Sequence, residues 1–342
     1  METKKNYICV SGYSASGSSA VVDLLKEFDN VFECSAEIRI IQDPYGIRQL
    51  ERALTDDWNE ISSSAAINDF LWLCKKCAKK GGGKNPFAPC GLSYSRKICS
   101  GFYSLSLRFI EKISDYKYKS DYYCQKFKKN YFRYVFDRIR LGLELKSKRK
   151  LRIANRRTGL CYFSHPTHDF FENAVREYFD SIFSSAFDKG ANYIVLDQAI
   201  SVNDPDAVSR YFNNGKLIIV DRDPRDMFID DIVNWGNVFE NLSSKEAGER
   251  FVIRHKAMRS SISNSKNILY IKFEDLVLKY DETVLAVLEF LEMDNHAHVK
   301  KGAFFKPQVS KNNIGIWRKY YNEFKDAIDY ITKELQSYCF EA

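Results

Sequence analysis

The chain has 342 residues, of which 45% are hydrophobic and 28% charged, proportions that are typical of a globular enzyme and exclude a disordered protein. Its net charge of +7 conceals a basic middle, because residues 75–157 hold 24 Lys and Arg against 5 Asp and Glu. No stretch of 18 uninterrupted apolar residues suits a membrane span, and the N-terminus lacks the apolar core of a signal peptide, so we expect a cytoplasmic protein.

The first predicted elements are a strand, a loop and a helix. Residues 7–10 form a short apolar run, residues 11–19 are small, and residues 20–28 carry apolar side chains at helical spacing. A second short strand is expected at 31–34. After Pro166 the pattern predicts strands at 193–196, 216–220 and 268–271 and helices at 167–187, 204–213, 225–236, 244–262 and 280–292. This alternation predicts an α/β fold with a central parallel sheet and helices on both faces.

Residues 46–160 are expected to form a mainly helical, basic insertion within one domain that spans residues 1–342. Amphipathic stretches lie near 66–80, 104–117 and 127–145, and no strand pattern is evident between 46 and 160. The basic residues suit an anionic membrane surface, a polyanionic substrate or nucleic acid, or they simply form a solvated helix face. Of these partners, we do not expect nucleic acid.

Nine cysteines at irregular spacing are better explained as reduced thiols than as a disulfide framework. Cys74 and Cys77 form a C-x-x-C pair, but a structural zinc site needs a second close pair, and Cys90 and Cys99 are loosely spaced. We therefore expect no bound metal.

The loop between the first strand and the first helix has the spacing of a phosphate-binding loop. Gly12 and Gly17 are separated as in a Walker A motif, but Ser18 occupies the place of the lysine that reaches the phosphates of ATP or GTP. Backbone amides at a helix N-terminus still suit an anion, although a turn that merely joins strand to helix is the alternative. The candidate ligand-binding residues here are Tyr13, Ser14, Ala15, Ser16, Gly17, Ser18 and Ser19.

Four segments in this order resemble the sulfotransferases that use 3′-phosphoadenosine 5′-phosphosulfate. Residues 14–19 (S-A-S-G-S-S) are similar to the family's P-[KR]-S-G-T-T loop, and residues 222–230 (R-D-P-R-D-M-F-I-D) to its R-D-P-R-D-x-x-x-S element. Residues 271–277 (I-K-F-E-D-L-V) and 313–318 (N-I-G-I-W-R) are similar to its Y-E-D-L-V and G-x-W-[KR] segments.

The resemblance implies a role for each segment. The loop would hold the 5′-phosphosulfate, with Ser18 and Ser19 as hydroxyl donors, and Arg222 would bind the 3′-phosphate. Gly315 and Trp317 would cover the nucleotide. A structural ion pair is the alternative for Arg222, and a core position is the alternative for Trp317.

A catalytic base is implied by a second, local resemblance. Residues 34–41 (C-S-A-E-I-R-I-I) look like the C-G-E-E-T-R-I-I segment of tyrosylprotein sulfotransferases, whose second glutamate is the base. By this match Glu37 takes the acceptor proton, and Arg39 pairs with it or orients the acceptor. An exposed surface pair is the alternative, and His165 and His168 are alternative bases.

Three positions depart from the family pattern. Ala15 replaces the cation of the loop, Gln198 falls where a later strand end often has lysine, and Asp230 replaces the serine that touches the 3′-phosphate. An ionised Asp230 would repel a phosphate unless an arginine or lysine lies between them. Arg225, Lys311 and the basic insertion are the candidates to supply the missing charge.

The sequence therefore favours a sulfotransferase that modifies a hydroxyl acceptor, and the basic segment favours a glycan or a lipid-linked glycan, with peripheral contact to an anionic membrane. A relative that binds a nucleotide or phosphate without catalysis is the alternative. A P-loop kinase or NTPase would need a Mg²⁺-binding acid such as Asp197 or Asp221, and the loop lysine is absent.

Overall fold

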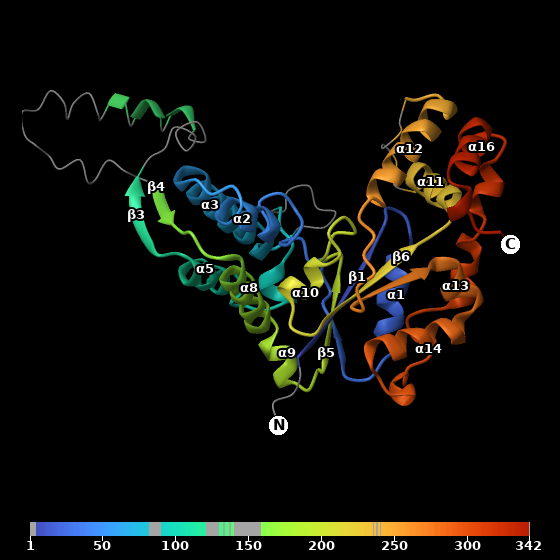
Figure 1. Ribbon diagram of the computed structural model, residues 1–342, viewed down its shortest axis with the longest axis horizontal. Helices are drawn as coiled ribbons and strands as arrows, with labels where there is room; N and C mark the ends of the chain where they lie inside the picture. The colour runs from blue at the N-terminus through green and yellow to red at the C-terminus, as the bar shows by residue number, and fades with distance from the viewer. Residues whose placement is uncertain are drawn as a thin grey trace, which may run out of the picture.

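The computed structural model describes residues 5–81, 90–120, 130–132, 134–136, 138–139, 159–234, 236, 239 and 241–341 (Figure 1). Its central sheet has five strands in the order β2-β5-β1-β6-β7, and every neighbouring pair is parallel. These strands are β1 (Asn6–Gly12), β2 (Val31–Glu33), β5 (Tyr193–Asp197), β6 (Gly215–Asp221) and β7 (Ile268–Lys272). The register places Ile8 of β1 opposite Val195 and Lys216. The predicted α/β class with a central parallel sheet is confirmed.

The helices that accompany this sheet lie close to the predicted positions. The predicted helix at 167–187 is divided at Phe183 into two, and the helices at 273–278, 307–310 and 325–334 were not predicted. In chain order they are α1 (Ser18–Leu25), α8 (His168–Ile182), α9 (Ser184–Asp188), α10 (Ala207–Tyr211), α11 (Pro224–Val233), α12 (Ser244–Met258), α13 (Phe273–Leu278), α14 (Tyr280–Leu291), α15 (Pro307–Ser310) and α16 (Lys325–Glu334). Short 3-10 turns follow at Asn295–Ala297, Lys311–Asn313, Ile316–Tyr320 and Gln336–Tyr338. No helix among the described residues has the length and apolar character needed to cross a membrane.

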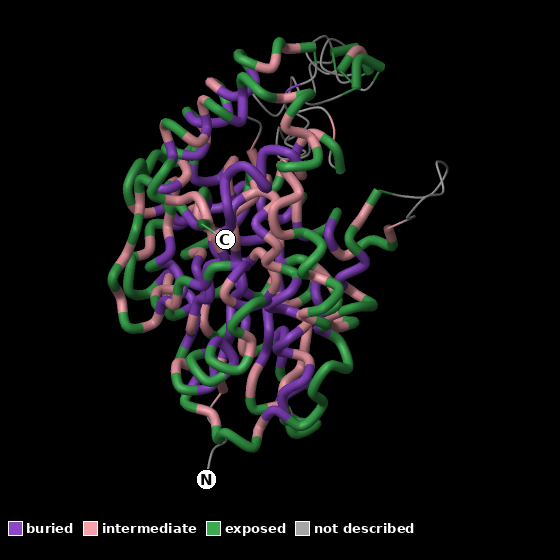
Figure 2. The backbone as a smooth tube through the Cα atoms, turned by 90° about the vertical axis from the view of Figure 1, so that its right-hand side faces the viewer, coloured by how far each residue is buried: buried purple, intermediate pink, exposed green. Residues whose placement is uncertain are grey.

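Both faces of the sheet are buried, as Figure 2 shows by the buried backbone at its centre. Tyr7 and Cys9 of β1 belong to one hydrophobic core, which also receives residues of α8, α10, α11, α12 and α16. Ile8 and Val10 point to the opposite face and join a second core built from α1, α13 and α14. Because side chains alternate along a strand, each central strand needs apolar residues at successive positions, and this requirement explains the short unbroken apolar runs in the sequence.

Residues 46–160 are mainly helical where they are described, with α2 (Ile47–Leu54), α3 (Glu60–Ala78), α4 (Tyr94–Lys97) and α5 (Phe102–Ile113). The expectation that they contain no strand is wrong. Strands β3 (Tyr116–Ser120) and β4 (Gly159–Phe163) form an antiparallel pair. The Tyr116 ring stacks on Phe163 with centroids 4.9 Å apart. In β3 aromatic and lysine residues alternate with a period of two, but its partner strand is too distant in sequence for the pairing to be predicted.

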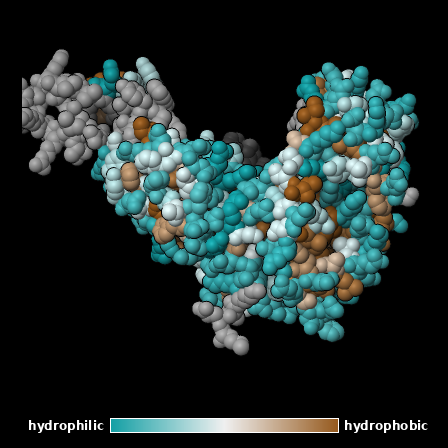
Figure 3. Space-filling model, viewed as in Figure 1, coloured by the Kyte–Doolittle hydropathy of each residue, from teal (hydrophilic) through white to brown (hydrophobic). Residues whose placement is uncertain are grey.

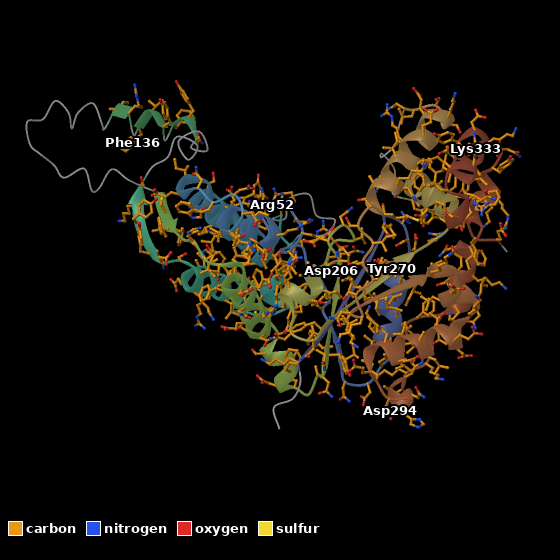
Figure 4. The ribbon with its side chains drawn as sticks, viewed as in Figure 1. Arg52, Phe136, Asp206, Tyr270, Asp294 and Lys333 are labelled. Atoms are coloured by element: carbon orange, nitrogen blue, oxygen red, sulfur yellow. The ribbon has the colours of Figure 1, made fainter. Side chains whose placement is uncertain are left out.

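The predicted amphipathic stretch at 127–145 falls largely outside the described residues. Phe136, one of the residues described there, lies well away from the central sheet (Figure 4). The assignment of residues 46–160 as an insertion in a single domain stays a prediction, although Ile67 and Phe109 join the same hydrophobic core as Tyr7 of the sheet.

Glu27 lies just beyond α1 and fixes a distant segment of the chain. It is fully buried, and its carboxylate accepts hydrogen bonds from Nε2 of His298 at 2.8 Å and from the amides of Gly302, Phe304 and Phe305 at 3.0, 2.8 and 2.8 Å. A buried carboxylate is tolerated only where donors satisfy its oxygens. The end of α1 and residues 298–305 are therefore held together by one side chain.

Replacing Glu27 by alanine should lower the free energy of unfolding by about 3–5 kcal/mol, because four donors lose their acceptor and two of them, the His298 ring and the Phe305 amide, are buried. Urea denaturation measures this change. Glu282→Ala, on an exposed position of α14, is the matched control and should change the stability by less than about 0.5 kcal/mol. Equal effects of the two substitutions would contradict the anchoring role of Glu27.

Candidate functional site

A cleft of about 1020 Å³ opens where β1, β5 and β6 end at their carboxyl termini. Figure 3 shows the surface hollowed between the part that carries α2 and α3 and the part that carries α11 and α12. Ligands of open parallel sheets bind at this edge, because the loops that follow the strands converge there. The residues that line the cleft are Gly12–Ala20, Asp23, Glu37, Arg39, Gln42, Asp43, Asp197, Gln198, Arg222, Asp230, Met258, Phe273, Phe304–Lys306, Val309, Ser310 and Asn313.

The loop from Gly12 to Ser19 forms one wall of the cleft and has a backbone that few residues adopt. Ala15 and Gly17 have φ angles of 59° and 82°, in the left-handed region. At Gly17 a Cβ atom would also lie 2.7 Å from the Phe273 ring, so glycine is required there for space as well as for conformation.

The loop leaves its amides available to a ligand. Within the described residues, the Ser16 amide donates to the Tyr13 carbonyl at 3.0 Å, and the amides of Ala15, Gly17, Ser18 and Ser19 donate to no protein acceptor. The Ser16 hydroxyl is buried and has no hydrogen-bond partner in the described part of the chain. Amides that point from a turn at the start of a helix make a concave site for an anion. The prediction of an anion-binding loop thus has the geometry it requires.

The side chains at the start of the loop support it rather than face a ligand. The Ser14 hydroxyl donates to Asp231 at 2.8 Å, and Asp231 is held in turn by Arg254 at 3.0 Å. The Tyr13 ring lies under the guanidinium of Arg259, 3.6 Å from its centre, and burial raises the pKa of Tyr13 to about 12. Both residues attach the loop to neighbouring helices.

Gln198, at the end of β5, contacts the same loop. Its side-chain amide donates to the Ser18 hydroxyl at 2.9 Å, and its own amide donates to Val10 of β1 at 2.9 Å. Its φ of 52° turns the chain away from the sheet. The sequence comparison therefore located this position correctly beside the loop, where a neutral amide stands instead of a cation.

Arg222 lies at the junction of β6 and α11 and joins three segments. Its Nη1 donates to the Ala15 carbonyl at 3.0 Å and to Asp230 at 2.6 Å, and its Nη2 donates to the Asn313 carbonyl at 2.6 Å. Its side chain is 2% exposed, yet the residue lines the cleft. The alternative considered for Arg222, a structural ion pair, is present in the structure. A role in binding a ligand stays a prediction.

Glu37 and Arg39 lie in the same cleft as the loop, as the local resemblance requires. The Glu37 side chain is 57% exposed, and Arg39 approaches it at 3.4 Å while making closer contacts to Asp43 at 2.6 Å. Tyr94, which is fully buried, holds this segment because its hydroxyl donates to the Glu37 carbonyl and accepts from the Arg39 amide. Residue 94 lies in the predicted insertion, so the insertion supports the wall of the cleft.

Asp197 is a second carboxylate on this wall, which the sequence suggested only as a metal ligand. Its carbonyl accepts from the Ile38 amide at 3.0 Å, which holds the Glu37 segment against β5. One carboxylate oxygen, Oδ1, is buried and has no partner among the described residues. Burial raises the pKa of Asp197 to about 6, and the negative charges of Glu37 and Glu33 act in the same direction.

Gly315 and Trp317 do not line the cleft. Both of their amides donate to Asp226, at 2.7 and 3.0 Å, and the Arg225 guanidinium lies 4.4 Å from the centre of the Trp317 ring. Their expected role as a cover for a nucleotide stays a prediction. The lining residues nearby are Asn313, which begins the segment 313–318 quoted from the sequence, and Lys306, Val309 and Ser310, which the sequence did not single out.

The other candidates from the sequence lie outside the cleft lining. His165 packs on Trp58 with centroids 4.6 Å apart, and His168 contacts Asp56 at 2.9 Å. Cys74 and Cys77 are buried in α3. Across the described residues, no group of three or more His, Cys, Asp or Glu side chains is arranged to hold a metal ion.

Asp197→Asn should raise the free energy of unfolding at pH 7.5 by about 1–2 kcal/mol. This is less than the free energy that corresponds to the full two-unit pKa difference, because the side chain is partly exposed. The folded-state pKa of about 6 exceeds the ordinary value of 3.8, so the ionised form destabilises the fold above pH 6. This difference vanishes below pH 4, where both states are protonated. Urea denaturation at pH 7.5 and pH 4 measures it, and equal stability of the two proteins at pH 7.5 would contradict the inferred burial cost.

Comparison with protein families finds no family model that matches the chain, and no curated protein matches it. Among solved structures, it is similar to a sulfotransferase from Alicyclobacillus acidocaldarius, with 10% identity, a TM-score of 0.35 and coverage of 97% of this chain and 96% of the other. It is similar to the sulfotransferase domain of the Synechococcus PCC 7002 olefin synthase, with 11% identity, a TM-score of 0.38 and coverage of 100% and 98%. Sulfotransferase STF9 from Mycobacterium avium gives 11% identity, a TM-score of 0.38 and coverage of 100% and 78%. At such identities and TM-scores, the function has to be argued from the cleft itself.

Proposed function

We propose that the protein is a sulfotransferase that moves a sulfuryl group from a nucleotide 5′-phosphosulfate to a hydroxyl acceptor. The observation that carries this proposal is the loop, which offers free amides at Ala15, Gly17, Ser18 and Ser19 but has Ser18 where a nucleoside triphosphatase needs lysine. Such a loop suits a phosphosulfate, because this group can be held without the lysine and the metal ion that a nucleoside triphosphatase uses.

The donor end of the cleft is the loop, and the family resemblance implies 3′-phosphoadenosine 5′-phosphosulfate as the donor. The loop amides and the Ser16 hydroxyl, which has no hydrogen-bond partner among the described residues, stabilise the negative charge that develops on the 5′-phosphate as the sulfuryl group leaves. The nucleoside extends from the loop toward Arg222 and Asp230, which line the same cleft. We propose no metal in this reaction.

The acceptor end is the wall formed by Glu37 and Arg39. The acceptor oxygen attacks sulfur, the bond from sulfur to the phosphate oxygen breaks, and the hydroxyl proton passes to the Glu37 carboxylate. We propose a glycan or a lipid-linked glycan as the acceptor, with the basic residues 75–157 contacting its negative charges or an anionic membrane. No described residue of 75–157 lines the cleft, so this segment would act outside it.

A nucleotide-binding protein without catalysis is the second candidate. It is favoured by the replacement of loop and strand-end cations by Ala15 and Gln198. Such a protein would bind the same nucleotides but would neither transfer the sulfuryl group nor form the bisphosphate, so turnover distinguishes the two. A kinase is disfavoured by Ser18 and by Asp221, whose carboxylate is engaged by Arg259 rather than free for Mg²⁺.

Adenosine 3′,5′-bisphosphate should stabilise the protein more than ATP with Mg²⁺. At a hundredfold excess over its dissociation constant, the gain is about 2.7 kcal/mol, measured as a rise in the melting temperature. Gly17→Ala should abolish the rise, because its Cβ would meet Phe273 at 2.7 Å and the backbone is left-handed. Gly101→Ala, where a Cβ would meet nothing within 4 Å, should retain it. Stabilisation by ATP with Mg²⁺ alone would contradict the proposed function.

Glu37→Gln should leave the affinity for the nucleotide nearly unchanged and slow the release of bisphosphate from the donor by about 10²–10⁴-fold, because glutamine keeps the size but cannot take a proton. The assay supplies 3′-phosphoadenosine 5′-phosphosulfate and soluble saccharides. Glu282→Gln, on an exposed part of α14, is the control. Full turnover in the Glu37 variant would show that Glu37 is not the base and that it only forms a surface ion pair with Arg39.

A further inference from the structure

We propose that Asp230 determines nucleotide specificity by cancelling the charge of Arg222, so that the cleft gains nothing from a second phosphate on the nucleotide. The cleft would then bind a nucleotide with one anionic group, placed at the loop, about as tightly as a 3′,5′-bisphosphate. The inference rests on the proposed function only in that a nucleotide occupies this cleft.

The hydrogen bonds of Arg222 leave little of its guanidinium for a ligand. Arginine has five N–H donors, and the two nitrogens of its fork already serve the Ala15 carbonyl, Asp230 and the Asn313 carbonyl at 2.6–3.0 Å. Its Nε has no partner among the described residues, but the atom is buried. The Phe273 ring covers one side of the guanidinium, with its centre 5.2 Å away. A phosphate could bind the fork only by displacing a partner.

Asp230 is the partner that a phosphate would have to displace, and it is held firmly. One of its oxygens accepts from Arg222 at 2.6 Å, and the other accepts from the side-chain amide of Asn234 one turn later in the chain. The Asp230 side chain is 20% exposed and lines the cleft, so its charge faces an incoming ligand. Breaking an ion pair this buried is strongly unfavourable, because it leaves an uncompensated charge.

The remaining charges of the cleft do not replace the one that Asp230 cancels. Carboxylates outnumber cations along the described lining, and the cation Arg39 is engaged by Asp43. The carboxylates are Asp23, Glu37, Asp43, Asp197 and Asp230, and the cations are Arg39, Arg222 and Lys306. Neutral amides of the loop are thus the main anion site, and a second phosphate meets a wall that is negative overall. Among the described lining cations, Lys306 alone forms no ion pair, so it is the other residue that could bind a second phosphate.

Isothermal titration with adenosine 5′-monophosphate and adenosine 3′,5′-bisphosphate tests the proposal. In the unmodified protein the bisphosphate should bind no more than about threefold more tightly than the monophosphate. In Asp230→Ser, the bisphosphate should gain about 10–100-fold over the monophosphate, because the freed guanidinium forms charge-assisted bonds to the second phosphate. Asp281→Ser removes the same charge from an exposed position of α14 and should leave the ratio unchanged.

If the serine variant does not fold, Asp230→Asn replaces it, because asparagine keeps the size of the side chain. It should also raise the affinity for the bisphosphate relative to the monophosphate. A tenfold or larger preference for the bisphosphate in the unmodified protein would overturn the proposal, and loss of that preference in Lys306→Ala would assign it to Lys306. An unchanged ratio in folded Asp230→Ser and Asp230→Asn would also overturn it, while leaving the proposed function intact. If neither nucleotide binds the unmodified protein, both proposals fail.

Discussion

The site depends on one constraint, the left-handed turn that joins β1 to α1. Because Ala15 and Gly17 adopt positive φ angles, the chain reverses within a few residues and the amides that follow point outward, unpaired by the helix. Every other feature of the cleft is arranged around this turn. Gln198 and Asp231 bond to its hydroxyls, Arg222 bonds to its carbonyl, and the Phe273 ring packs against its glycine.

Much of this arrangement could be predicted from the sequence because it depends on local patterns. Short runs of four or five residues, most of them apolar, indicated the five parallel strands, and Gly12 and Gly17 indicated a loop between the first strand and its helix. Glu37 follows β2, which lies beside β5, so it lines the cleft at the edge where both strands end, and its role as a base stays a prediction.

The remaining features depend on contacts between residues distant in sequence, which no local pattern encodes. The pairing of β3 with β4 joins residues on either side of a long basic segment, and the contact of Tyr94 with the Glu37 segment joins residues 57 apart. A structural ion pair was considered for Arg222, but its partner Asp230, eight residues away, was not identified, because the pair forms only where the Arg222 side chain is buried beside Phe273 and the Asn313 carbonyl. Burial also gives Asp197 a higher pKa than an ordinary surface carboxylate has.

The short helix α1 connects two walls of the cleft that are otherwise unrelated in sequence. The loop of residues 12–19 lies at one end of this helix. Beyond the other end, the Glu27 carboxylate accepts hydrogen bonds from residues 298–305, which continue into the cleft wall at Lys306. Eight residues of helix form a stiff rod about 12 Å long. Because the helix is rigid and contacts at both of its ends belong to the cleft walls, it holds the loop and residues 304–306 at a set distance from one another.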